Sequence, residues 1–554
     1  MEAGREDGLA AERRAWRRGR RWLWWIAGGV LLALLAVELG LRRAEPFLRE
    51  RIVTQLEERF RARVELDGFH VSLAGGLWAE GKGLRVWPAA QAAGSPAAAG
   101  EPLIRLDEFR FHAPLSYGPG RPIHISVVEL KGLSVHLPPK TARTADGVAG
   151  GSPAAGKATH GVELVSFQVD TIECVGAELV LATSKPGKLP TELAIARFKL
   201  TNVAAGAAMG FDAKLTNPRP KGTIITTGSF GPWQTADPGE SPITGQYRFE
   251  HADLSGFNGI AGILSSTGRY QGTLHNLTVD GQTDTPDFHL THFGNALRLT
   301  TRFHARVDGT NGDTWLEPVE AMLGHSSFSV RGQVVRVPGA VVAGVQRGRG
   351  HDIALTVNAE RARIEDFLRL ASRGPTPLMT GALAMQAAVD IPPGAAPVHQ
   401  RMILDGRFTL DQARFTNAKV QSRIAELSLR GQGRPQELKT ADPAGILSHL
   451  AGAFRLDGGV LTLPALDYNV PGAKIQLAGS YTLEDEGLHF EGTARMAAPI
   501  SKMVGGWKGL LLSPVDRYFE KHGAGTEVPI HIEGTREQPK FGIDFDRMKP
   551  HAQP

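Results

Sequence analysis

The sequence predicts a mostly β protein whose body is an elongated antiparallel sheet of repeating hairpins, carried by one N-terminal transmembrane helix. From Val64 onward, apolar and polar residues alternate with period two, as they do in strands that bury one face. Glycine and proline, present in 66 and 35 copies, interrupt this alternation about every ten residues. One long apolar run stands near the N-terminus.

Length and composition favour an extended body over one compact core. A chain of 554 residues exceeds what a single hydrophobic core usually holds, and aromatic residues make up only 7% of it. The only cysteine, Cys174, excludes an intramolecular disulfide and a zinc site built from the thiolates of one chain. Sheet pairing and burial must therefore hold the body together.

The N-terminus carries the signals of a membrane anchor. Six arginines precede an apolar run over residues 22–41 that is interrupted only by Glu38, and about 20 such residues span a bilayer. The positive-inside rule keeps residues 1–21 in the cytoplasm and exports the body, so the basic charge indicates topology before nucleic-acid binding. The predicted anchor residues are Trp22, Trp24 and Trp25 at the interface and Leu31, Leu34 and Leu41 in the run.

A cleaved signal peptide is the alternative interpretation of this run. Its apolar region would be shorter and would end at a small-x-small site, whereas residues 37–39 read Val-Glu-Leu. We therefore expect the helix to remain as an anchor.

Residues 47–63 predict an amphipathic helix, because Leu48, Ile52, Leu56 and Phe60 recur every four residues. Its apolar stripe can cap the end of the sheet or lie on the membrane surface. We favour the capping role.

Alternation also predicts which residues share a face of the sheet. Gly406, Phe408 and Leu410 follow a recurrent pattern in which an aromatic residue comes two positions after glycine, as Gly452 and Phe454 also do. Such recurrence is typical of units that bury their apolar face only against their neighbours. The residues expected to line one apolar face are Phe109, Phe111, Val135, Leu137, Phe408, Leu410, Phe454, Leu456, Ile475 and Leu477.

Two stretches, residues 88–102 and 138–161, contain almost no large apolar residue, and we expect them to form disordered loops outside the sheet. Short helices are expected at residues 361–371 and 502–519.

Two clusters of polar residues could hold a metal ion. Residues 308–313, Asp-Gly-Thr-Asn-Gly-Asp, resemble a calcium loop but lack the spacing and distal glutamate of an EF-hand, and a tight turn demands the same residues. Asp284, Asp287, His289 and His292 are close in sequence, yet the two histidines would point to opposite faces of a strand. We expect a turn and a strand edge respectively.

No nucleophile elbow, phosphate-binding loop or zinc-protease motif occurs; residues 324–328 lack the final glycine of the first. The sequence therefore predicts no catalytic residue, no metal site and no cofactor, and we expect a protein that is not an enzyme.

Both ends of the exported body carry short segments that resemble the AsmA-like family of inner-membrane proteins of diderm bacteria. At the start these are Ile52-Val53-Thr54-Gln55-Leu56, Val64-Glu65-Leu66 and Gly81-Lys82-Gly83-Leu84-Arg85-Val86. Near the end, residues 524–535 (AGTEVPIHIEGT), followed by Pro539, are similar to the closing strands of AsmA-like domains.

This resemblance implies a strongly curved sheet whose concave apolar face forms a groove for lipid, as in bridge-like lipid-transfer proteins. It divides the chain into an anchor, an N-terminal AsmA-like region over residues 45–137, the loop at 138–161, and a repeating groove with a C-terminal AsmA-like region over 162–545. It places the anchor in the inner membrane and the body in the periplasm.

The function expected from these observations is the handling or transport of membrane phospholipid in support of outer-membrane assembly. Some 450 residues at about 13 per strand and turn predict about 35 strands and a sheet on the order of 165 Å long. A protein partner in the envelope could then be needed at the distal end. The alternatives are a non-enzymatic scaffold or outer-membrane protein assembly factor that binds proteins by strand addition, and an envelope hydrolase, for which no converging acids or nucleophile are evident.

Overall fold

The computed structural model describes most residues between 63 and 543 and a few between 45 and 57. The main gaps in the larger span are residues 73–76, 88–101, 114–122, 138–166, 182–187 and 505–525. The predicted tail and anchor, residues 1–41, and almost all of both predicted loops lie outside the described residues. Within the described ranges, no helix has the length and apolar character needed to cross a bilayer.

A single sheet of 24 strands forms the body, which confirms the mostly β prediction. Its first strands are β1 (Arg63–Ser72), β2 (Leu77–Trp87), β3 (Ile104–Ala113), β4 (Ile123–Leu137), β5 (Phe167–Leu181), β6 (Thr191–Val203), β7 (Met209–Pro218), β8 (Lys221–Phe230), β9 (Pro242–Asp253), β10 (Ile260–Ala261), β11 (Ile263–Thr273) and β12 (Asn276–Leu290). It continues with β13 (Leu297–Val307), β14 (Thr314–Leu323), β15 (Ser326–Pro338), β18 (Arg349–Arg363), β19 (Met379–Ile391), β20 (Ile403–Phe415), β21 (Ser448–Asp457), β22 (Val460–Val470), β23 (Ala473–Thr482), β24 (Gly487–Met496), β25 (Thr526–Thr535) and β26 (Pro539–Ile543). The short strands β16 (Val341–Val342) and β17 (Val345–Gln346) pair only with each other.

The strands are fewer and longer than the sequence suggested. Most contain 10 to 15 residues, so the 24 strands replace the expected 35 or so. In the described part of the chain, the expected length of about 13 residues per strand and turn was therefore too short, because glycines such as Gly268 and Gly406 lie inside strands and do not end them.

Successive strands of the sheet pair side by side, except that the short β10 pairs with β12 while β9 pairs with β11. The pairing is antiparallel except between β4 and β5. In that parallel pair Leu130 lies beside Cys174. A parallel connection needs a crossover of a dozen residues or more, and residues 138–166 supply it. The prediction of an antiparallel sheet is therefore correct everywhere but here.

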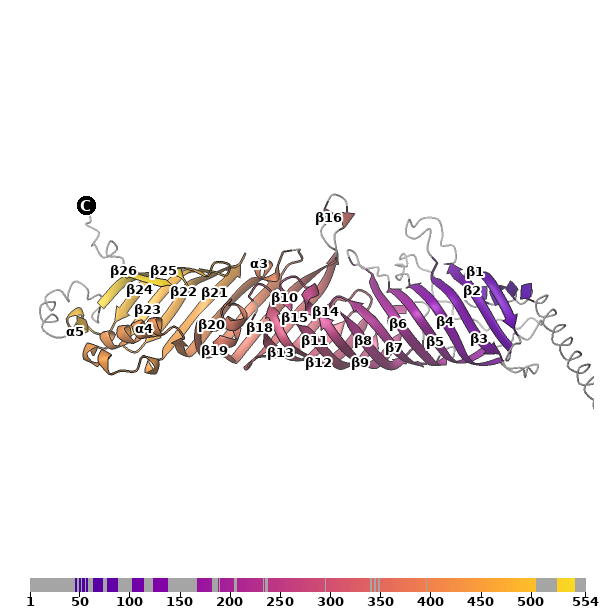
Figure 1. Cartoon of the computed structure of the whole chain (residues 1–554), viewed down its shortest axis with the longest axis horizontal. Helices are drawn as coiled ribbons and strands as arrows, with labels where there is room; N and C mark the ends of the chain where they lie inside the picture. The colour runs from indigo at the N-terminus through magenta and orange to yellow at the C-terminus, as the bar shows by residue number, and fades with distance from the viewer. Residues whose placement is uncertain are drawn as a thin grey trace, which may run out of the picture.

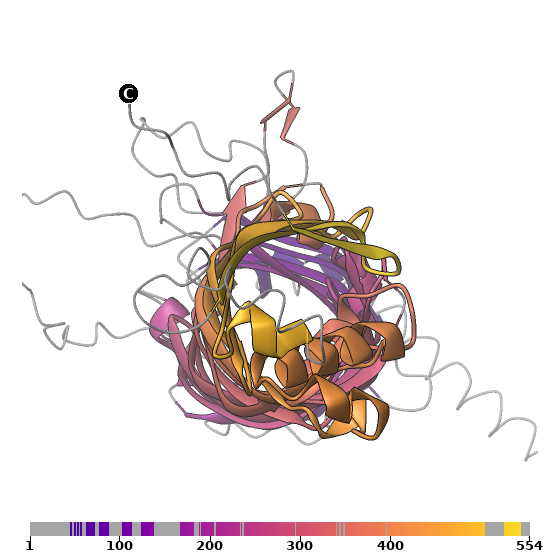
Figure 2. The ribbon, with the colours of Figure 1, turned by 90° about the vertical axis from the view of Figure 1, so that its left-hand side faces the viewer.

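The strands cross the long axis of the molecule obliquely, from β1 at one end to β26 at the other (Figure 1). Seen down that axis, the sheet is curled around it (Figure 2). The helices α4 (Ala418–Gly431) and α5 (Ile500–Val504) lie at the C-terminal end of the curl (Figure 2).

The same interruption of the pairing occurs twice in the first four strands. The register between β1 and β2 skips Asp67 and Gly83, and the register between β3 and β4 skips Asp107 and Gly132. Both glycines have positive φ, +67° and +65°, and a Cβ on either would stand within 2.2 Å of the facing aspartate carboxylate. Only glycine fits both the conformation and the space, so the Lys-Gly-Leu segments of β2 and β4 occupy equivalent positions in the two pairs of strands.

The remaining helices are short. The prediction over residues 361–371 corresponds to α2 (Ile364–Leu370), which begins later because residues 361–363 still belong to β18. The segment predicted at 502–519 begins in α5, and the rest of it lies outside the described residues. The other helical segments are α3 (Val398–Arg401), η1 (Pro238–Glu240), η2 (Leu254–Gly256), η3 (Pro435–Lys439) and η4 (Pro443–Gly445).

Polar side chains from residues 45–57 lie along the free edge of β1. Arg49 donates from Nε to the carbonyl oxygen of Leu66 at 2.8 Å. The backbone N–H of Val64 donates to Glu57 at 3.1 Å, and that of Val71 donates to Glu45 at 3.3 Å. Because an unpaired edge strand is a site for unwanted pairing, these contacts protect the edge of β1; the role of the apolar stripe stays a prediction.

Candidate functional site: the apolar inner face of the sheet

One face of the sheet, called here the outer face, is charged and solvated. Glu108 lies between Lys82 at 3.4 Å and Lys131 at 3.6 Å, and Arg298 pairs with Asp284 at 2.8 Å. The hydrogen bond from Lys82, and then the positive charges of Lys82 and Lys131, lower the pKa of the Glu108 carboxyl. Such exposed pairs contribute little stability, but they keep this face in water.

The opposite, inner face is apolar along the sheet. Leu66 on β1, Leu106 on β3, Leu410 on β20 and Val528 on β25 lie on it, each at most 8% exposed. The helix α4 packs against this face through Ile424 and Leu427 and lies with α5 at the end of the curl (Figure 2). The apolar face is therefore the concave one.

Aromatic rings on the inner face lie over glycines of the neighbouring strand. Phe109 is in register with Gly81, and Phe454 with Gly406. A Cβ on Gly81 would stand 2.1 Å from the Phe109 ring, and a Cβ on Gly406 2.8 Å from the Phe454 ring. Gly245 and Gly479 likewise face the rings of Tyr270 and Phe490. This packing explains much of the glycine–aromatic recurrence in the sequence, because these glycines leave room for a ring of the next strand.

The sequence-predicted residues of the N-terminal part lie on this face. Phe109, Phe111 and Val135 are half-buried, and the rings of Phe109 and Phe111 stack at 6.4 Å. Leu137 is the last residue of β4, and its side chain is outside the described set. The first three side chains retain surface that an apolar ligand can contact.

The predicted residues of the C-terminal part divide into two groups. Leu410, Leu456 and Ile475 are buried, with exposures of 1%, 4% and 6%. Those that remain half-buried are Phe408, Phe454 and Leu477, and the rings of Phe408 and Phe454 lie 6.1 Å apart. Pairing brings the strands of these residues side by side from β20 to β23.

The burial at this end comes partly from α4, which our sequence analysis missed. Val420, Ile424 and Leu427 provide the helical spacing. Asn417 caps the helix by accepting from the backbone N–H of Lys419 at 3.0 Å. Ile424 and Leu427 pack on the cluster that contains Leu410 and Ile475. The protein's own helix thus covers part of the inner face that was expected to remain accessible.

A band of hydroxyl groups interrupts the apolar inner face between β8 and β13. Thr226 donates to the carbonyl oxygen of Gln246 at 2.9 Å, and its oxygen lies 2.6 Å from the Tyr270 hydroxyl. Ser266 and Tyr247 repeat the arrangement one strand along, at 3.0 Å, and Thr283 pairs with Thr301 at 2.7 Å. Burial raises the pKa of the Tyr270 phenol, so this band is neutral and hydrogen-bonding. Sequence reasoning missed it because isolated Ser, Thr and Tyr residues carry no pattern.

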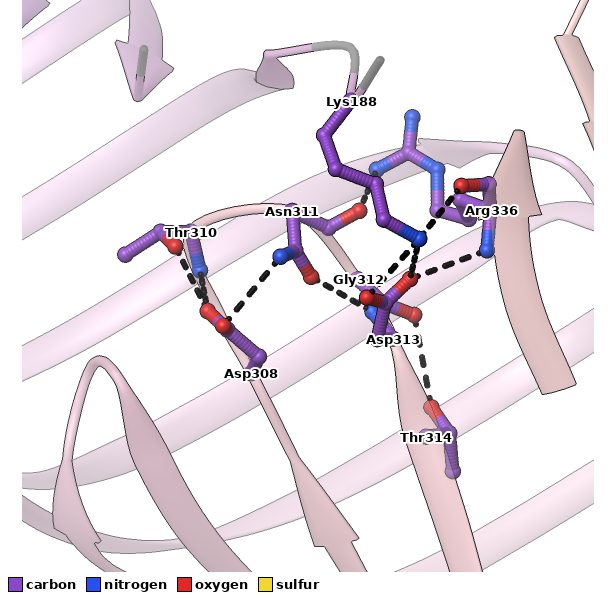
Figure 3. A network of polar contacts seen from close by, with 8 residues as sticks. All are labelled: Lys188, Asp308, Thr310, Asn311, Gly312, Asp313, Thr314 and Arg336. Carbon is purple, nitrogen blue, oxygen red and sulfur yellow. Dashed lines mark hydrogen bonds and ion pairs between the residues drawn. The ribbon is translucent and has the colours of Figure 1, made fainter. Parts of the chain in front are cut away.

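Residues 308–313 form the tight turn between β13 and β14 (Figure 3). Asp308 is 1% exposed and accepts from the backbone N–H of Thr310 at 3.0 Å and from Asn311 at 3.2 Å. Asp313 accepts from the backbone N–H of Arg336 at 3.0 Å and pairs with Lys188 at 3.0 Å. Both carboxylates therefore accept hydrogen bonds from groups of the protein itself, as expected of a tight turn.

The second candidate cluster is dispersed. Asp284 pairs with Arg298, and Asp287 accepts from the backbone N–H of Ile263 at 2.9 Å. His292 contacts Arg373 at 2.9 Å. Among the described residues, no group of three or more histidine, cysteine or acidic side chains is arranged to hold a metal ion.

Comparison of this chain with protein-family models, curated proteins and solved structures finds no significant match.

Proposed function

We propose that this protein is an AsmA-like component of the cell envelope that carries the acyl chains of phospholipids along the inner face of its sheet. The body would stand in the periplasm on an inner-membrane anchor and support outer-membrane assembly. The observation that carries the proposal is the separation of the two faces, with apolar side chains on the concave side of the curl and paired charges on the convex side.

The energetics favour this use of the inner face. Each CH₂ group that leaves water gains about 0.8 kcal/mol, and half-buried rings such as Phe109 and Phe111 offer a surface on which a chain can slide. No catalytic residue is needed for such movement.

A photocrosslinking amino acid tests the proposal in living cells. Placed at Phe111 on the inner face, it should capture phospholipid, detected by mass spectrometry of the adduct. The matched control is Arg110, which is adjacent in β3 but pairs with Glu129 on the outer face at 2.9 Å. Equal capture at both positions, or adducts only with protein at Phe111, would refute lipid carriage.

A scaffold that binds protein by strand addition is the second candidate. It is favoured by β26, a short terminal strand whose Phe541 is 56% exposed. Substitution of Phe541 by Asp should then abolish a protein crosslink at β26 while leaving lipid capture at Phe111 unchanged.

A further inference from the structure

The two long rims of the curled sheet touch each other. The strand ends at Thr191, Asp253, Leu297 and Ser326 follow one another through the pairings from β6 to β15 and form one rim, called here the Thr191 rim. The opposite ends of the same strands, including the turn at Asp313, form the Asp313 rim. Contacts between the two rims join residues more than a hundred positions apart.

The strongest of these contacts is the network drawn in Figure 3. Lys188, from the β5–β6 connection, donates to the Asp313 carboxylate at 3.1 Å and to the carbonyl oxygen of Arg336 at 3.1 Å. Arg336 in turn donates to the hydroxyl of Thr191 at 3.3 Å and to the carbonyl oxygen of Asn311 at 3.0 Å. The Lys188 and Asp313 side chains are only 18% and 7% exposed, so the two rims are packed together here.

Further contacts continue this junction, which we call the seam, along the sheet. The backbone N–H of Val398 donates to the carbonyl oxygen of Asn258 at 3.0 Å. The rings of His292 and His399 stack at 4.8 Å. Near the C-terminal end, Arg536 reaches the carbonyl oxygen of Thr376 at 3.5 Å. The pairings from β15 to β26 extend both rims along the sheet. Val398, His399 and Arg536 lie on the Asp313 rim, and their partners Asn258, His292 and Thr376 lie on the Thr191 rim.

The seam changes what can pass along the inner face. In an open groove, the polar head of an amphiphile stays in water at the slit while its chains lie on the apolar wall. Where the rims are joined, the head has no slit to project through. The hydroxyl band of Thr226, Tyr247 and Tyr270 lies on the inner face of strands within this joined section, where it can hydrogen-bond to an enclosed polar head.

We propose that the seam makes this section a closed conduit that admits amphiphiles with compact heads, encloses them entirely and excludes those with large heads. This inference rests on the proposed function and specifies its substrate class. The expected cargo is a phospholipid; a lipid that carries a long polymer or oligosaccharide on its head would be excluded.

The test compares two inner-face positions in the full-length protein in vesicles. Phe111 on β3 precedes Lys188, the first residue at which we identify a rim-to-rim contact in the described part of the chain. Phe303 on β13 has seam contacts at both ends of its strand, through Asp313 and His292, and its ring lies over Gly281 as that of Phe109 lies over Gly81. Each position receives the photocrosslinker in a separate variant.

The vesicles contain phosphatidylethanolamine, either unmodified or with a polyethylene glycol chain on its head. We expect the photocrosslinker to capture the unmodified lipid at both positions and the modified lipid at Phe111 only. Equal capture of the modified lipid at Phe303 would overturn the closed conduit, and its exclusion from Phe111 would show that something other than the seam excludes it. If unmodified lipid were captured at neither position, lipid carriage itself would be refuted.

Discussion

Replacing Asp313 by alanine should loosen the seam, and the structure sets the size of the effect. The substitution removes the partner of Lys188, which is 18% exposed, and the acceptor of the Arg336 N–H. Breaking a buried ion pair from one side costs about 3–5 kcal/mol. Lys188 keeps its bond to the carbonyl oxygen of Arg336, so we expect the lower end, about 3 kcal/mol.

Hydrogen exchange of the Arg336 backbone N–H measures this loss directly, because that group donates to Asp313. A change of about 3 kcal/mol corresponds to exchange roughly a hundredfold faster in the peptide that contains β15. The double variant with Lys188→Ala should recover part of the loss, with a coupling of about 1–3 kcal/mol.

The matched control is Asp284→Ala. Asp284 also pairs with a single cation, Arg298, but the two side chains are 39% and 65% exposed. Exposed pairs are worth about 1 kcal/mol or less, so exchange around β12 should barely change. If Asp313→Ala accelerated exchange no more than this control, the seam would not be a stabilising contact.

Four further outcomes are expected. Leu410→Ala should lower the unfolding free energy of the C-terminal strands by about 2–5 kcal/mol, because Leu410 is 1% exposed in the main apolar cluster. Hydrogen exchange measures this loss, and a change below about 1 kcal/mol would contradict the packing. Gly81→Ala should destabilise β2 and β3, because the new Cβ meets the Phe109 ring. Adding Phe109→Ala should relieve this clash, and a double-mutant cycle followed by thermal unfolding measures the effect. Burial, and then the charge of His292, lower the pKa of His399. The contribution of this group to stability is therefore full above the unfolded pKa of about 6.5 and is lost as the pH drops from there to the lowered folded pKa. His399→Gln should reduce this pH dependence in denaturation curves, and the remainder should include the contribution of His351, whose pKa is also lowered by burial. Cys174 is fully buried and burial raises the pKa of its thiol, so maleimide should label it only after unfolding.

Alternation carried most of the fold information in the sequence. Side chains of a strand point to opposite faces in turn, so Phe109 and Phe111, or Phe408 and Leu410, could be assigned to one face without coordinates. The glycine–aromatic recurrence was visible as well, although its cause, a ring of one strand over a glycine of the next, required the register.

The helix α4 and the parallel pair of β4 and β5 show where local reasoning stopped. The Val420, Ile424 and Leu427 spacing was available, but strand signals surround it on both sides. The parallel pairing depends on where the chain returns after residues 138–166, which no local pattern records.

The sequence by itself determined that one face of the sheet is apolar and the other charged, because each residue's face follows from its position along a strand. Only the tertiary structure decided what the apolar face encloses. The curl brings Lys188 to Asp313 across 125 positions and joins rims that the sequence leaves unrelated. Period-two patterning acts within one strand, whereas closure depends on the curvature and stagger accumulated over many strands, so the seam could be found only in three dimensions.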